Sequence, residues 1–292
     1  MSQSRAPAWV VPMMRFGYSA RGFTYVLLGG LVLSAAMTGG QAESTQSALA
    51  TLRGQPFGPA LLWLLAIGFL AYSAWRFICA GMDLERRGTD AKGIIARIGQ
   101  SVSGLVYGGL AVTSARLAMG AGGSGGGGNG TRTLASWLLE QPMGKWLVVA
   151  AGLITIGAGA YYGVKAWKES YKEHMAATPT SQKLDPVIKG GLVAHGIVIA
   201  IIGGFLAYAG WTSDPSDAGG MTQAFEAVRA QPYGQVLLAA LAVGLVGFAV
   251  YCFVEARYRI VPARAGDDVT TLAAQARNKV EQEGRKAASH VS

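Results

Sequence analysis

A Gln-Pro-x-Gly tetrapeptide occurs three times in this chain, and its repetition constrains the fold more than any other feature. An apolar run follows each tetrapeptide. An earlier apolar run opens with a Lys or Arg, a glycine two residues later and a glycine seven residues later. Two motifs in the same order, three times over, indicate internal repeats. The repeat turns are formed by Gln55, Pro56 and Gly58, by Gln141, Pro142 and Gly144, and by Gln231, Pro232 and Gly234.

The apolar runs have the length of membrane-spanning helices, since about 20 apolar residues of helix cross the hydrocarbon of a bilayer. Only 14% of the residues are charged, against about 25% in an ordinary soluble domain. The runs are continuously apolar and do not alternate with polar residues, which excludes barrel strands. We therefore predict an all-α integral membrane protein with six transmembrane helices at about 17–37, 60–79, 98–118, 146–165, 190–211 and 236–255.

Each repeat has one layout: an odd helix, a polar segment, a short helix at the membrane surface, the Gln-Pro turn and an even helix. The short helices are expected at 47–52, 134–139 and 225–228, because proline disfavours helix in the residue before it. The glutamine is expected to offer its amide to exposed N–H groups of the even helix. We interpret the turns as architectural, with a binding surface of three gathered turns as the alternative. The predicted repeats cover 15–88, 97–175 and 188–259, between an N-terminal segment at 1–14 and a tail at 260–292.

The basic residues predict the orientation. With the N-terminus inside, 20 of the 25 Lys and Arg lie on the cytoplasmic side, so both termini are expected in the cytoplasm. The net charge of +9 then reflects topology and attraction to anionic lipid, and a nucleic-acid partner is excluded. Because each repeat crosses twice, all three insert in parallel, and a pseudo-three-fold bundle around an axis along the membrane normal is the natural arrangement.

One variable position within the spans is a candidate functional site. Arg21, Ser103 and His195 each lie six residues past the opening cation, about 9 Å further along a helix. Around a shared axis these side chains approach one another near the cytoplasmic end. Ionisable groups within spans are functional by default, and histidine titrates near neutral pH. The alternatives are that Arg21 extends to the headgroups and that a backbone carbonyl satisfies His195.

Other polar and reactive residues are assigned to structural roles. We interpret Arg116 and Glu255 as interfacial, with Glu255 paired to Arg259 one helical turn later. Cys79 and Cys252 are expected to pack in the interior. In the tail, Asp267 and Asp268 can cap an amphipathic helix that bears apolar side chains on one face, Val269, Leu272, Ala273, Ala276 and Val280. A solvated, partly disordered tail is the alternative.

Glycines and aromatic residues within the spans have expected packing roles. Small residues allow helices to approach closely in lipid, and nine glycines are candidates: Gly22, Gly29, Gly30, Gly104, Gly108, Gly109, Gly196, Gly203 and Gly204. Aromatic residues near span ends fit interfacial belts: Trp63, Trp75, Trp146, Trp167, Trp211, Tyr161 and Tyr251. The glycine-rich run at 121–130 is interpreted as a linker outside the membrane.

The threefold pattern resembles the bacterial membrane family called domain of unknown function 1206, over about residues 13–258. The resemblance is most specific at Gly17, Gly22, Gln55, Pro56, Gly58 and their counterparts. It implies the topology described above and a bacterial inner-membrane location, and it supplies no activity. The first repeat, with Trp75 and Arg76, is most similar to the family pattern, whereas Tyr162 and Cys252 stand in place of Arg76 in the others.

The sequence favours a non-enzymatic protein without cofactor or metal, because it shows no nucleophile–base pair and no ligand cluster. We expect an accessory, scaffold or assembly subunit of a membrane complex, with a membrane-protein partner. The alternative is a channel or carrier for a small solute or ion along the repeat axis, with Arg21, Ser103 and His195 near its inner mouth. A membrane enzyme ranks last.

Overall fold

A computed structural model describes residues 9–85, 87–121, 129–175 and 178–260. Over these ranges the chain is helical apart from its connections, and one isolated β-bridge joins Met175 to Arg259. Five described helices are long and apolar enough to cross a membrane: α1 (Val10–Thr38), α3 (Gly58–Met82), α6 (Gly144–Trp167), α8 (Asp185–Thr212) and α10 (Gly234–Tyr258). The predicted tail helix lies outside the described residues, as does most of the glycine-rich run.

The remaining expected span lies in α4 (Ala91–Ala118), which is as long as α8 but more polar. Lys92 and Arg97 fall near its start and Arg116 near its end. Its inner face also carries Gln100 and Ser114, both buried. The helix itself is confirmed, whereas its membrane crossing stays a prediction.

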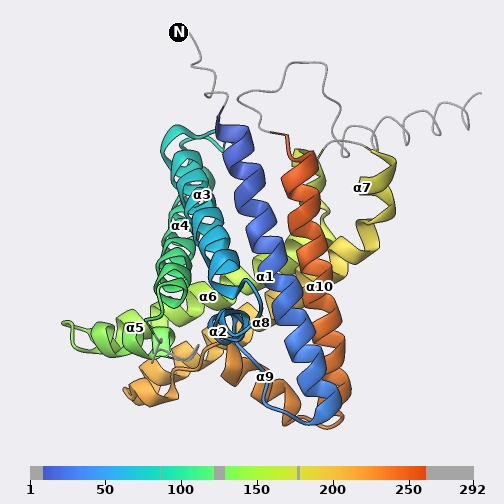
Figure 1. The fold of residues 1–292 in the computed structure, drawn as a ribbon. Helices are drawn as coiled ribbons and strands as arrows, with labels where there is room; N and C mark the ends of the chain where they lie inside the picture. The colour runs from blue at the N-terminus through green and yellow to red at the C-terminus, as the bar shows by residue number, and fades with distance from the viewer. Residues whose placement is uncertain (1–8, 86, 122–128, 176–177, 261–292) are drawn as a thin grey trace, which may run out of the picture.

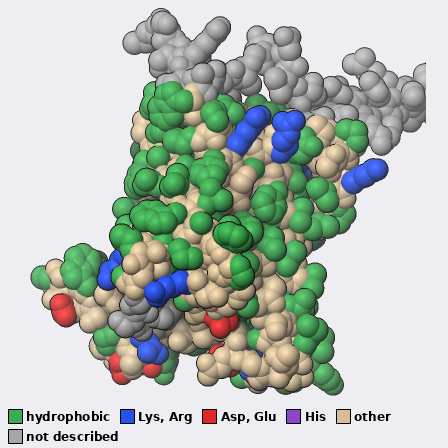
Figure 2. All heavy atoms as spheres, viewed as in Figure 1, with side chains coloured by type: hydrophobic (Ala, Val, Ile, Leu, Met, Phe, Trp, Pro, Cys, Tyr) green, Lys and Arg blue, Asp and Glu red, His purple; other side chains and the backbone are tan. Residues whose placement is uncertain are grey.

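The three predicted short helices are confirmed as α2 (Thr45–Arg53), α5 (Asn129–Leu139) and α9 (Met221–Arg229). All three lie at one end of the bundle, opposite the start of α1 and the end of α10 (Figure 1). We call these the turn end and the terminal end. Figure 2 shows a mainly hydrophobic surface over the middle of one face, with Lys and Arg near both ends and carboxylates near the turn end.

The Gln-Pro-x-Gly motif folds identically in each repeat. The glycine N–H donates to the glutamine carbonyl at 2.8 Å in all three turns. The residue between proline and glycine is left-handed, with φ of 60° at Phe57, 62° at Met143 and 60° at Tyr233. Proline followed by a positive φ is the pattern of a type II turn. A Cβ on the last glycine, such as Gly58, would collide with carbonyl oxygens that end the short helix, so only glycine fits there.

The expected role of the glutamine side chain is wrong in two repeats. Gln141 Nε2 donates to the carbonyl of Trp137 at 3.3 Å, and Gln231 Nε2 donates to that of Ala227 at 3.2 Å. The amide therefore satisfies a carbonyl of the preceding short helix, because such carbonyls lack partners at a helix C-terminus. It does not reach the N–H groups of the following helix.

The long helices pack in an open arc, in the order α4, α3, α1, α10, α8 and α6. Between repeats, each even helix packs against the odd helix of the next repeat. These contacts join α3 to α4, α6 to α8, and α10 back to α1. The short helices follow the same rule, since α2 contacts α4 and α5 contacts α8. In α9, Arg229 donates to the carbonyls of Gly39 and Gly40 at the end of α1, both at 2.6 Å. Within repeats, α1 packs on α3 and α8 on α10, whereas α4 and α6 do not pack together in this way.

Close contacts at glycine hold these interfaces. A Cβ on Gly22 would lie 2.9 Å from the Phe253 ring, and one on Gly104 would lie 3.0 Å from the equivalent Phe77 ring. Six of the nine candidate glycines have such a neighbour within 4 Å. Packing is the wrong prediction for Gly30, Gly109 and Gly204, where a Cβ would meet nothing within 4 Å.

The neighbouring residues Gly203 and Gly204 test this packing. A Cβ on Gly203 would lie 2.6 Å from the backbone nitrogen of Ile156, whereas one on Gly204 would face open space. We expect Gly203→Val to lower the unfolding free energy by about 1–3 kcal/mol, because overpacking forces α6 and α8 apart. Gly204→Val is the matched control. Equal thermal midpoints of the two variants in detergent would contradict the assigned contact.

Candidate functional site

The interior between the repeats holds a buried cation, Arg21. Its side chain donates from Nη1 to the Tyr72 hydroxyl at 2.9 Å, and its Nε is buried without a partner. The guanidinium carbon lies 4.8 Å from the Phe248 ring centroid and 5.3 Å from that of Tyr107. Among the described residues no carboxylate pairs with it. Arg21 is 6% exposed, so the alternative in which it extends to the headgroups is wrong.

His195 lies against the same aromatic cluster. Its ring stacks on Phe248 at 3.9 Å between centroids and meets Tyr25 and Tyr162 edge-on at 5.2 and 4.8 Å. Its Nδ1 is buried and has no partner, so no backbone carbonyl satisfies that nitrogen. The structure thus brings Arg21 and His195 together around one phenylalanine, as the repeat register predicts.

Ser103, the third member of the predicted position, is half-buried. No hydrogen bond or ring contact places it with the other two in the described part of the chain. It belongs to α4, the odd helix that does not pack on the even helix of its own repeat. The predicted trio is therefore a pair.

Sequence reasoning missed the aromatic residues that surround Arg21. Tyr25 and Tyr107 are both ten residues past the opening cation of their repeats, and Tyr72 and Phe248 are both 17 residues past the turn glutamine. Tyr72 contacts both Tyr18 and Tyr107 edge-on, at 5.0 and 4.6 Å. Aligning the spans by repeat, in place of reading aromatics as interfacial, would have revealed this register.

The position of Arg76 in the even helices also faces the interior. Arg76 lies 5.7 Å from the Tyr72 ring centroid, and its Nε is buried without a partner. Its counterpart Tyr162 contacts His195, and its other counterpart Cys252 is fully buried. Cys79 is likewise a buried free thiol, so the packing role expected of both cysteines is confirmed.

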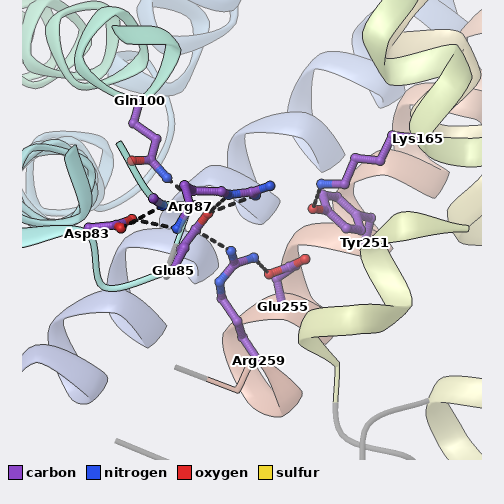
Figure 3. Close-up of polar contacts among 9 residues, drawn as sticks. Asp83, Glu85, Arg87, Gln100, Lys165, Tyr251, Glu255 and Arg259 are labelled. Carbon is purple, nitrogen blue, oxygen red and sulfur yellow. Dashed lines mark hydrogen bonds and ion pairs between the residues drawn. The ribbon is translucent and has the colours of Figure 1, made fainter. Parts of the chain in front are cut away.

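A second polar cluster lies at the terminal end of the same interior and joins all three repeats (Figure 3). Glu85, in the α3–α4 connection, accepts from Arg87 Nη2 at 2.9 Å and from Arg259 Nη2 at 2.5 Å. It also accepts from Gln100 Nε2 of α4 at 2.9 Å. Beside this network, Lys165 of α6 donates to the Tyr251 hydroxyl of α10 at 2.8 Å.

Glu255 was expected at the interface with solvent, and this is wrong, because its side chain is fully buried. The predicted pairing with Arg259 is confirmed, with Arg259 Nη1 donating to Glu255. Tyr251 and Trp75, expected in an interfacial belt, are buried as well, at 3% and 0% exposure. The repeats close tightly at this end and enclose residues that lie near span ends in the sequence.

The three turns themselves present exposed side chains. Phe57, Met143 and Tyr233 are 83%, 74% and 85% exposed. Each projects from the turn end, where apolar and aromatic side chains suit the lipid headgroup region. Among the described residues, no cluster of His, Cys, Asp or Glu could hold a metal ion.

Comparison with known proteins identifies the family. A family model described as Domain of Unknown Function (DUF1206) matches residues 16–83, 98–169 and 190–259, one segment for each repeat. The chain belongs to this family. It is also similar to an uncharacterized protein, YxxB, of Bacillus subtilis (strain 168), with 30% identity over 86% of this chain and 92% of that protein. No solved structure matches the chain.

Membership in the DUF1206 family confirms the resemblance drawn from the repeated turns and glycines. The family segments begin next to the opening cations and end beyond the even helices. The interior cluster is assembled from all three segments, so it is a property of the complete threefold protein and not of a single repeat.

The carboxylate of Glu85 offers a test of the terminal-end network. Glu85→Gln leaves Arg259 with one carboxylate fewer in a buried setting, and breaking a buried pair costs about 3–5 kcal/mol. We expect a clearly lower thermal midpoint in detergent. Glu140→Gln, at an exposed carboxylate, is the control and should leave the midpoint unchanged. If both variants melt like the parent, the network does not stabilise the fold.

Proposed function

We propose that this protein is a non-enzymatic membrane protein that crosses the bilayer six times and serves as an accessory or assembly subunit of a membrane complex. The three repeats insert in parallel into the inner membrane of a bacterium, with both termini in the cytoplasm. The concentration of Lys and Arg toward the terminal end supports this orientation. Anionic lipid on that side is the expected surface partner.

The observation that carries the proposal is the filled interior. Where the repeats meet, Arg21 lies against four aromatic rings, those of Tyr72, Tyr107, Tyr25 and Phe248. Tyr72 contacts Tyr107, and Tyr25 contacts Phe248. Such packing of aromatic rings around a cation supports a closed interior over an open solute path at this level. Toward the terminal end, the Glu85–Arg259–Glu255 network ties the repeats together. Such a body is suited to holding other membrane segments in place.

Purification of the chain at its native expression level tests the proposal. We expect the tagged chain, extracted in mild detergent from its own membrane, to migrate in a complex with a second protein. That complex should be lost when the gene for this chain is deleted. The parent strain with an unrelated tagged membrane protein is the control. A monodisperse species that contains only copies of this chain would contradict an accessory role.

Arg21 favours a second candidate function, a carrier for a small anion. A cation in a membrane interior without a carboxylate partner is costly and marks a ligand or transport path in many membrane proteins. The unpartnered nitrogens of Arg21 and His195 are free to meet an anionic oxygen or a halide. Transport along this path would require the surrounding rings to move.

Liposome flux distinguishes the carrier from the accessory subunit. If the protein carries anions, purified protein in liposomes moves chloride, nitrate or acetate, and Arg21→Met and His195→Ala abolish the flux. Arg15→Met, at an exposed arginine of the same helix, is the matched control and keeps it. Absence of flux across this anion panel would eliminate the carrier.

A further inference from the structure

The second repeat contains an interface that the chain itself does not complete. We propose that a second copy completes it, with α4 of each copy packed against α6 of the other across a two-fold axis along the membrane normal. The inference is independent of the accessory role, since a dimer of this chain can form with or without another partner.

The odd helices show the first half of this unfilled interface. A Cβ on Gly17 would lie 2.7 Å from the Cα of Tyr72, and one on Gly191 would lie 2.7 Å from the Cα of Phe248. Both glycines are thus pressed against the even helix of their own repeat. Gly99 is the equivalent glycine of α4, yet it is exposed and a Cβ there would meet nothing within 4 Å.

The next positions along this helix face follow the same pattern. Five residues past the opening cation, Ala20 and Ala194 are 8% and 7% exposed, whereas Val102 of α4 is 54% exposed. Nine residues past it, the residues of the first and third repeats are buried, whereas Val106 is 57% exposed. One whole face of α4 is therefore open where its two counterparts are covered.

The even helix of the second repeat is open at the matching positions. Thirteen residues past the turn glutamine, Gly68 and Gly244 contact the alanines of their odd helices, whereas Ile154 of α6 is 72% exposed. Twenty residues past it, Trp75 and Tyr251 are 0% and 3% exposed, whereas Tyr161 is 52% exposed. The open faces of α4 and α6 are thus the two halves of one interface that the other repeats close.

The two open faces still fit each other. In the register of the closed repeats, Gly99 is opposite Ala158, which stands where Tyr72 and Phe248 stand in the other repeats. Val102 is opposite Ile154 in the same register. The larger side chains are therefore at Val102 and Ile154 in this repeat, and the small residues Gly99 and Ala158 still face each other. Close approach at small residues drives helix association in lipid, where apolar area alone does not.

The chain cannot bring these faces together without breaking other contacts. α6 is pressed onto α8, where a Cβ on Gly159 or Gly210 would lie 2.6 Å from a backbone atom. α4 is fixed to α3 by a hydrogen bond from Ser73 Oγ to the carbonyl of Gly104, at 2.7 Å. A second copy supplies both missing faces at once, and the same patch on each copy closes the dimer.

Disulfide crosslinking in native membranes tests this arrangement. In a background with Cys79→Ala and Cys252→Ala, one tagged chain carries Val102→Cys and a differently tagged chain carries Ile154→Cys. On coexpression and oxidation we expect a heterodimer that carries both tags. Adding Gly99→Leu, which faces open space in one copy, should lower the crosslinked fraction about tenfold and leave the thermal midpoint of the chain unchanged.

A control pair places cysteines at equally exposed positions on other helices, Ile67→Cys on α3 and Val243→Cys on α10, at 56% and 60% exposure. This pair should give no heterodimer. Three results would overturn the proposal. The first is a disulfide within one chain that carries both Val102→Cys and Ile154→Cys, without any dimer. The second is no crosslink in any combination of chains. The third is a control pair that crosslinks as well as the test pair. The first result would mean that α4 packs on α6 within one chain. The second would mean that lipid covers the open faces of α4 and α6.

Discussion

The close approach of α10 to α1 is the contact on which the rest of the structure depends. It joins the last helix of the chain to the first and so packs the third repeat against the first. Gly22 and Gly29 permit it, because a Cβ at either would lie within 3 Å of side chains of α10. Two buried polar groups of the interior, Arg21 and Glu255, come from these two helices.

The packing of α10 on α1 explains why charged groups can lie inside an apolar protein. Moving a charge from water to a low-dielectric interior costs several kcal/mol unless close partners compensate it. At the terminal end, the Arg259 guanidinium pairs with Glu85 from a different repeat and with Glu255 of its own repeat. Deeper in, Arg21 has only a phenol hydroxyl and aromatic faces. The cation–π contacts each contribute about 0.5–2 kcal/mol, which offsets part of that cost for Arg21.

Much of this arrangement could be predicted from the sequence because it repeats. The turns, the short helices and the burial of Arg21 and His195 follow from motif spacing and the helical rise. The aromatic enclosure could not be predicted in the same way, since a tyrosine in a span suits the lipid interface as well as an interior. Glu255 was misplaced for a related reason: a carboxylate near a span end usually reaches water, and only the crossing of three repeats encloses it.

The second repeat departs from the pattern for a reason visible only in three dimensions. Its sequence carries the same glycines, so the motif predicts the same packing. Val102 and Ile154 replace an alanine and a glycine that touch in the other repeats, so the second repeat lacks that contact within the chain. A motif shows which residues recur, whereas an interface depends equally on the residues between them.

The most direct test of the contact between α1 and α10 is a covalent link between these two helices. In a chain without native cysteines, Gly29→Cys and Val246→Cys should form a disulfide, since a Cβ on Gly29 would lie 2.7 Å from Val246 Cγ2. After cleavage at a protease site inserted between α4 and α5, the two fragments should migrate together, at the mass of one chain, on a non-reducing gel. Separation of the fragments without reductant would contradict the contact between α1 and α10.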